Sequence, residues 1–177
     1  MGKISFGFRS IVCAALLSAV AAFAQQPAVP VQGPVPPAIL AAKKIFVSNA
    51  GADSGLFASP FSGDPSRAYN QFYAELRAAG QFELVSDPAS ADLVLELQLT
   101  APNGPTNANK QNGTSDPLPM FRLVVYDRKT HYVLWALTRS IEVAYLQKTH
   151  DRNFDDALSS MVLEFEELAG KPPAAAH

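Results

Sequence analysis

Hydrophobic and polar residues alternate along two stretches in the middle of the chain. In residues 92–100, DLVLELQLT, every second residue is a leucine. Side chains of a β-strand alternate between the two faces of a sheet, so this pattern predicts a strand with one face on a core and one in water. Residues 121–126 and 133–141 alternate in the same way around the polar sequence DRKT. They predict an antiparallel hairpin, and residues 127–130 are expected to form its turn rather than a reactive site.

Two further stretches have the hydrophobic spacing of amphipathic helices. The first is predicted to begin at Asp64-Pro65, an N-cap followed by a proline at the first helical position, and to end at Gly80. The second is predicted over residues 152–169, with Asp151 as its N-cap. The apolar positions that share one face are Tyr69, Phe72, Tyr73 and Leu76 in the first helix, and Phe154, Leu158, Met161, Phe165 and Leu168 in the second.

Shorter apolar runs at residues 44–48 and 81–86 predict two more strands. Residues 49–64 and 101–117 are rich in turn-forming residues, and the second of these loops, which has no hydrophobic anchor, is predicted to be mobile. The order strand, helix, strand, strand, hairpin, helix predicts an α+β fold. We expect a two-layer sandwich, in which a mostly antiparallel sheet of about five strands carries two amphipathic helices on one face.

The first 24 residues are organised like a secretory signal peptide. Lys3 and Arg9 precede an apolar run at residues 11–23, which closes on the small-x-small sequence Ala22-Phe23-Ala24. This run is shorter than the roughly 20 residues that span a bilayer. We therefore expect cleavage and no stable membrane insertion afterwards; an uncleaved anchor is the alternative.

The remaining boundaries follow from proline and glycine. Residues 25–41 are uncharged and rich in proline. This composition predicts an extended linker without packed structure. The α+β domain is predicted at residues 42–170. Residues 171–177, which follow Gly170 and contain two prolines, predict a disordered tail.

Composition and charge indicate the compartment of the protein and exclude one class of partner. Removal of residues 1–24 takes Lys3 and Arg9 from the 14 basic residues and leaves 12 against 16 acidic ones, a net charge of −4. With no basic stripe in the rest of the chain, nucleic-acid binding is excluded. The single cysteine, Cys13, lies inside the predicted signal peptide. The mature chain is therefore predicted to be periplasmic or secreted and to fold without disulfides.

Candidate catalytic and metal-binding residues are few and dispersed. None of the three histidines, His131, His150 and His177, belongs to a metal-binding pair such as H-x-x-x-H, so we expect no metal and no cofactor. A histidine adjoins an acid and a base only at residues 150–152, and successive residues of a helix do not face one another. The predicted strands carry three carboxylates: Glu83, Asp92 and Glu96. Two interpretations stay open for them: they form the acid pair of a small hydrolase, or they lie on the solvated outer faces of the strands.

The predicted loop at residues 49–64 carries three large apolar residues on a polar segment: Leu56, Phe57 and Phe61. Such residues either pack inward or contact a partner. We predict that they bind a partner; a plain connection rich in turn formers is the alternative. The glycines of this loop lack the G-K-[ST] sequence of a phosphate-binding loop.

Several short motifs resemble one group of envelope proteins. They are KIFVSN at residues 44–49, ELRAAGQFELVS at residues 75–86, ADLVLELQLT at residues 91–100 and FRLVVYDRKTHYVLW at residues 121–135. In this order they are similar to the amino-terminal domain of TolB and to periplasmic domains of the LpoB and CsgG type. A similarity to small uncharacterised exported bacterial proteins is also present. TolB has a propeller after this domain and LpoB and CsgG are lipoproteins, whereas from this sequence we expect neither a propeller nor a lipidated cysteine.

The resemblance implies an exported, non-catalytic envelope protein that acts as a protein–protein binding or assembly module. Its partner is expected to be an envelope protein of unknown identity. Two alternatives stay open: a carrier of a small apolar ligand held between helices and sheet, and a small hydrolase.

Overall fold

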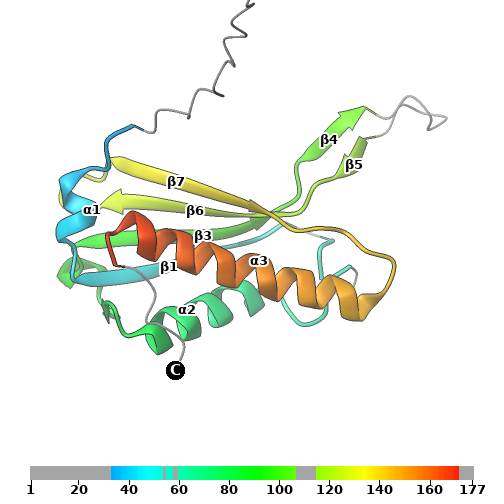
Figure 1. The fold of residues 1–177 in the computed structure, drawn as a ribbon, viewed down its shortest axis with the longest axis horizontal. Helices are drawn as coiled ribbons and strands as arrows, with labels where there is room; N and C mark the ends of the chain where they lie inside the picture. The colour runs from blue at the N-terminus through cyan, green and yellow to red at the C-terminus, as the bar shows by residue number, and fades with distance from the viewer. Residues whose placement is uncertain (1–32, 54, 58–59, 107–114, 172–177) are drawn as a thin grey trace, which may run out of the picture. The chain divides into compact units, whose positions relative to one another are not determined.

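The sheet determines the arrangement of everything else in the molecule. In the computed structural model, which describes residues 33–53, 55–57, 60–106 and 115–171, five strands lie in the order β2-β1-β3-β6-β7 (Figure 1). Their bounds are β1 Lys44–Ala52, β2 Glu83–Leu84, β3 Leu93–Thr100, β6 Met120–Asp127 and β7 Val133–Ser140. Strand β1 pairs in parallel with β2 and β3, whereas β6 pairs antiparallel with β3 and β7. The predicted signal peptide, residues 1–24, lies outside the described residues.

Two helices cover one face of this sheet. They are α2, Arg67–Ala79, and α3, Gln147–Leu168, which lie side by side (Figure 1). The alternating leucines of β3 point toward them, and all four are buried: Leu93, Leu95, Leu97 and Leu99. The α+β, two-layer prediction with helices on one face is thereby confirmed.

Aromatic side chains fill the centre of the layer between helices and sheet. The ring of Phe154 on α3 lies 4.9 Å from that of Phe121 on β6 and 5.2 Å from that of Phe61, measured between ring centroids. All three side chains are fully buried. The core therefore joins the loop after β1, the sheet and the long helix.

The predicted linker is wrong at its C-terminal end. Residues Pro37–Ala41 form a short helix, α1, and Ile39 is fully buried in the core. Proline is tolerated at the first position of a helix because the N–H that it lacks has no intrahelical partner there. Two of the prolines that indicated an extended linker, Pro36 and Pro37, instead begin a helix, and residues 25–32 lie outside the described part of the chain.

The predicted mobile loop at residues 101–117 also contains regular structure. Strands β4, Asn103–Thr106, and β5, Ser115–Pro117, pair antiparallel in a separate ribbon that leaves one end of the sheet (Figure 1). Residues 107–114 lie outside the described residues. At the C-terminus, Lys171 is held by the fold, since its Nζ donates to the carbonyl oxygens of Ala42 and Gln81 at 3.0 Å each. The predicted tail therefore begins too early, and residues 172–177 are outside the description.

Both long helices begin away from the predicted residue. Helix α3 begins at Gln147, so Asp151 lies within the helix and is not its N-cap. Helix α2 begins at Arg67, and the carboxylate of Asp64 accepts the N–H of Ser66 at 2.7 Å in the turn that leads into it. The predicted stop at Gly80 is confirmed, with φ at +66° in the left-handed region.

The β6–β7 hairpin forms as predicted. The carboxylate of Asp127 accepts the N–H groups of Lys129 and Thr130 at 2.7 and 3.1 Å, which closes the turn. Burial and these two hydrogen bonds act in opposite directions on the pKa of Asp127, and the hydrogen bonds, which dominate, lower it. His131 completes the turn with φ at +60°.

Candidate functional site

One end of the sheet carries an apolar groove of about 630 Å³. Three segments that are distant in sequence form it: the loop after β1, the residues that enter β6, and the segment that follows β7. We call this site the apolar groove, and its lining residues are Gly55, Leu56, Pro60, Leu118, Pro119, Ser140, Ile141, Glu142 and Val143. The ribbon β4–β5 leaves the sheet at the same end (Figure 1).

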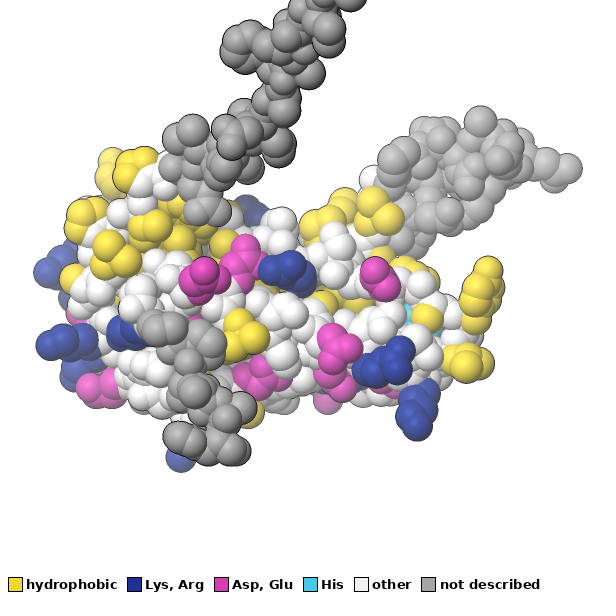
Figure 2. Space-filling view, in the orientation of Figure 1, with side chains coloured by type: hydrophobic (Ala, Val, Ile, Leu, Met, Phe, Trp, Pro, Cys, Tyr) yellow, Lys and Arg dark blue, Asp and Glu magenta, His cyan; other side chains and the backbone are white. Residues whose placement is uncertain are grey.

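Large apolar side chains remain exposed in the segment that follows β7, and one of them, Val143, lines the groove. Val143 is 58% exposed, Leu146 is 69% exposed and Tyr145 is fully exposed. We call these three residues the apolar rim. Figure 2 shows hydrophobic surface at the base of the ribbon and at the adjacent tip of the molecule. Several exposed apolar side chains in one short segment are typical of an interaction site.

Helix α3 fixes the segment that bears the apolar rim. The side-chain amide of Asn153 donates to the carbonyl oxygen of Glu142 at 2.9 Å. The N–H of Ala144 donates to Nδ1 of the buried His150 at 3.3 Å. The exposed side chains are therefore presented from an anchored backbone, which reduces the entropy that a partner must remove on binding.

The three apolar residues predicted to bind a partner have different surroundings. Leu56 and Phe61 are buried and Phe57 is half-buried. The ring of Phe61 packs against Phe154 and edge-on against His150, at 6.1 Å between centroids. Two of the three side chains therefore pack inward, and only Leu56 lies at the apolar groove. Partner contact by these residues stays a prediction.

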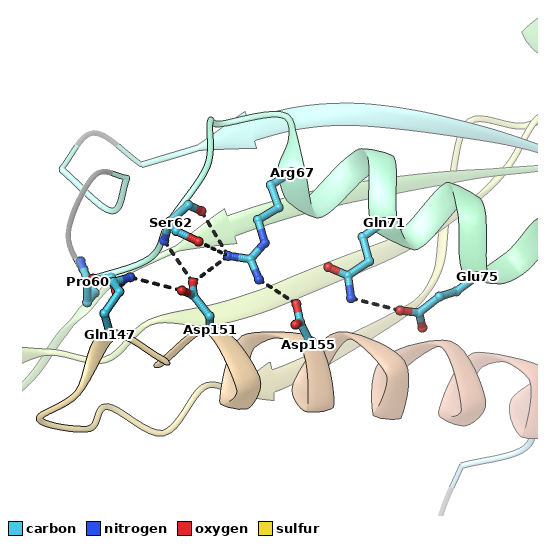
Figure 3. Close-up of polar contacts among 8 residues, drawn as sticks. All are labelled: Pro60, Ser62, Arg67, Gln71, Glu75, Gln147, Asp151 and Asp155. Carbon is cyan, nitrogen blue, oxygen red and sulfur yellow. Dashed lines mark hydrogen bonds and ion pairs between the residues drawn. The ribbon is translucent and has the colours of Figure 1, made fainter. Parts of the chain in front are cut away.

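A cluster of charged residues holds the loop after β1 against α3. The guanidinium of Arg67 donates to Asp151 at 2.7 Å and to Asp155 at 2.6 Å, and also to the carbonyl oxygen of Ser62 at 3.0 Å (Figure 3). It lies over the ring of Phe154, 4.3 Å from the centroid. We call Ser62, Arg67, Asp151 and Asp155 the Arg67 cluster. Because it is partly buried and bridges three segments, it stabilises one position of the loop.

The Arg67 cluster also places one wall of the groove. Asp151 accepts the N–H of Ser62 at 3.0 Å, and the side-chain amide of Gln147 donates to the carbonyl oxygen of Pro60 at 2.7 Å (Figure 3). Burial alone would raise the pKa of Asp151, but the hydrogen bonds from Ser62, Arg67 and Gln147 outweigh it and hold the pKa well below its ordinary value. Asp151 is therefore ionised at neutral pH and holds Ser62 against α3, while Gln147 holds Pro60, a groove residue.

The residues considered for catalysis have separate structural partners. The side chain of Asp92 accepts the N–H groups of Lys43 and Lys44 at 2.9 Å each, and Glu83 pairs with the side chain of Lys44 at 3.1 Å. Asp151 contacts Arg67 and not His150. Asp92, Glu83 and Asp151 thus each make a separate structural contact in the described part of the chain.

A second, open depression of about 420 Å³ lies on the sheet face that the helices leave uncovered. Its polar lining comprises Glu96, Tyr126, Asp127, Arg128 and His131. The hydroxyl of Tyr126 donates to Glu96 at 3.3 Å. Burial, and then the charge of Glu96, raise the pKa of Tyr126, so the phenol keeps its proton at neutral pH. Residues of the hairpin turn do line a concave surface beside His131, but that surface is open to solvent.

Within the described residues, no group of three or more His, Cys, Asp and Glu side chains is placed to hold a metal ion. In the same part of the chain, no helix combines the length and the apolar composition needed to cross a membrane.

No protein-family model and no curated protein matches the chain. Among solved structures, it is similar to a DUF4136 family protein from Bacteroides thetaiotaomicron, with 10% identity over 74% of this chain and 90% of that one and a TM-score of 0.47. The LpoB C-terminal domain from Salmonella enterica shares 13% identity over 57% and 83%, with a TM-score of 0.37. TolB from Acinetobacter baumannii shares 15% over 74% of this chain and 29% of TolB, with a TM-score of 0.40. Likeness at this level is remote and carries no argument about activity.

Proposed function

We propose that the protein is an exported, non-catalytic envelope protein that acts as a binding or assembly module, with the apolar groove and its rim as the contact surface. The observation that carries this proposal is the exposure of Val143, Tyr145 and Leu146 on a backbone anchored by α3. Three exposed apolar side chains beside a groove favour a protein partner, because water contact with such a surface is unfavourable.

The contacts of the titratable residues support a binding role over catalysis. The carboxylates and the histidine considered for catalysis hold loops, strand ends and helix positions. A catalytic site needs a nucleophile or general base within reach of a substrate in a concave site. Binding through an apolar surface needs no such group.

The proposed contact surface is tested by removing apolar side chains from the groove. Leu118→Ser combined with Val143→Ser should reduce capture of the partner severalfold in crosslinking inside the native host, read by mass spectrometry against the wild type. Leu163→Ser is the matched control, because Leu163 is 47% exposed on α3 and does not line the groove. The melting temperature of both variants should stay close to that of the wild type, since the replaced side chains are exposed. Unchanged capture in the double variant would contradict the proposal.

Export is tested independently by fractionation of the host and by sequencing the mature N-terminus. We expect the protein in the periplasmic or secreted fraction with Gln25 as its first residue, because the predicted cleavage follows Ala24. A cytosolic protein that retains Met1 would overturn this part of the proposal and leave the groove untouched.

A further inference from the structure

Strand β7 forms one edge of the five-stranded sheet. It has eight residues, contains no proline and carries one charged side chain, Arg139. The opposite edge strand, β2, has only two residues. A long edge strand presents unpaired N–H and C=O groups, and such edges are where another strand can add.

The outward-pointing backbone groups of β7 can be identified from its pairing. The N–H of Ile141 donates to the carbonyl oxygen of Pro119 in the direction of β6. Hydrogen-bonding positions alternate along an antiparallel strand, so after the register shift at Trp135 the backbone groups of the even-numbered residues point away from β6. Those residues are Ala136, Thr138 and Ser140, and all three are exposed. The edge leads directly into the apolar groove, because Ser140 also lines it.

The surface beside this edge is acidic. Glu142 and Asp156 line a polar depression with Arg139 and Ser140, and Glu164 pairs with Arg139. Helical spacing places Asp156, Ser160, Glu164 and Glu167 along one flank of α3. We call the four carboxylates at positions 142, 156, 164 and 167 the acidic flank. Arg139 lies among these side chains and the exposed Arg152 one helical turn before Asp156, so the four carboxylates still leave a net negative surface for a segment that lies along the edge.

We propose that β7 accepts an extended segment of the partner protein as an additional strand, and that this segment alternates apolar with basic residues and contains no proline. The inference rests on the proposed function and specifies the partner's chemistry. Backbone groups at Ala136, Thr138 and Ser140 bind the added strand, the acidic flank selects Lys or Arg, and the apolar groove receives the apolar end of the segment.

Charge favours such a partner over a second copy of this chain. Pairing of two β7 strands about a twofold axis would place both helix layers on the same side of the joined sheet. Two acidic flanks would then face each other, and like charges brought together in this way oppose association. A basic segment meets the opposite sign.

A peptide selection tests this specificity without knowledge of the partner. The purified protein is immobilised and screened against a random library of roughly ten-residue peptides, long enough to pair along β7. We expect selected sequences that alternate apolar residues with Lys or Arg and lack proline. Selected sequences that are acidic, proline-rich or spaced as amphipathic helices would overturn the inference, as would the absence of any selected sequence.

Hydrogen exchange with the tightest selected peptide tests the binding geometry. We expect the amides of Ala136, Thr138 and Ser140 to exchange about tenfold more slowly or better when the peptide is bound. Asp156→Asn combined with Glu167→Gln should weaken binding about fivefold, because two charges of the acidic flank are lost. The control variant, Glu75→Gln with Glu83→Gln, removes two carboxylates elsewhere and should leave peptide binding unchanged. A peptide that needs Val143 but leaves the three amides unprotected would refute strand addition and leave the groove as the contact surface.

Discussion

Glu166 on α3 has a buried carboxyl group, and one of its oxygens lacks a hydrogen-bond partner among the described residues. Its side chain is 1% exposed, and its Oε1 accepts no hydrogen bond within the described part of the chain. Burial disfavours the charged form and raises the pKa above the ordinary 4.5. The native protein therefore binds this proton more tightly than the unfolded chain, so the free energy of unfolding falls as pH rises from about 4.5 through the raised pKa.

Glu166→Gln removes the ionisable group and should stabilise the protein at neutral pH. We expect a gain on the order of 1 kcal/mol at pH 7 that shrinks toward pH 4, where the wild-type carboxyl is protonated. Urea unfolding at both pH values measures the effect. Glu167→Gln is the control, because Glu167 is the exposed neighbour. An equal gain in both variants, or none at pH 7, would be incompatible with an uncompensated buried carboxyl.

Arg67 needs its planar guanidinium, because it binds two carboxylates and a carbonyl oxygen at once. Lysine keeps the charge but cannot supply donors in that fixed arrangement. Arg67→Lys should lower the free energy of unfolding by about 1–3 kcal/mol, whereas Arg77→Lys at an exposed position of α2 should have little effect. Thermal unfolding of both variants measures the difference. If the two substitutions were equivalent, the cluster would contribute only its charge.

At the scale of the structural elements, α1 places two neighbouring residues in opposite environments, one buried and one exposed. Ile39 is fully buried, whereas Leu40 is 51% exposed. Ile39→Ala should lower the free energy of unfolding by about 2–3 kcal/mol, because it removes buried methyl groups and leaves a cavity. Leu40→Ala should change it by no more than about 0.5 kcal/mol. Chemical denaturation of the pair decides whether α1 belongs to the cooperative fold, and equal effects would place it outside.

The sequence predicted those elements whose hydrophobic period is long and uninterrupted. The alternating leucines of β3 and the spacing from Phe154 to Phe165 on α3 each extend over several turns or residue pairs, so a single exception cannot obscure them. Helix α1 has one buried residue and begins at a pair of prolines, and the ribbon β4–β5 has no hydrophobic alternation. In both elements, short-range geometry and packing with distant segments determine the structure. The local hydrophobic period of the sequence indicates neither of these causes.

At the scale of the whole molecule, the apolar groove has no single local sequence pattern because it is assembled from three distant segments. Leu118 and Val143 lie 25 positions apart in the sequence, and only the pairing of β6 with β7 brings them together. Leu56 was singled out and does line the groove, whereas Phe61 completes the core. One signal was available locally: the segment at residues 141–146, IEVAYL, is apolar although it lies between a strand and a helix, where loops are normally polar.

The hydrophobic core is continuous from Ile39 to Ala169, which predicts one cooperative unfolding transition. Trp135 is the single tryptophan and lies partly buried on β7, so its fluorescence reports on the edge of the sheet, while far-UV circular dichroism reports mainly on α2 and α3. The two signals should have the same midpoint in urea.

Phe154→Ala should lower both midpoints together, with a loss of about 3–5 kcal/mol in the free energy of unfolding, because Phe154 contacts Phe61, Phe121 and Arg67 at once. A fluorescence midpoint below the dichroism midpoint would mean that β7 unfolds separately, and an edge that unfolds on its own could not hold an added strand in register.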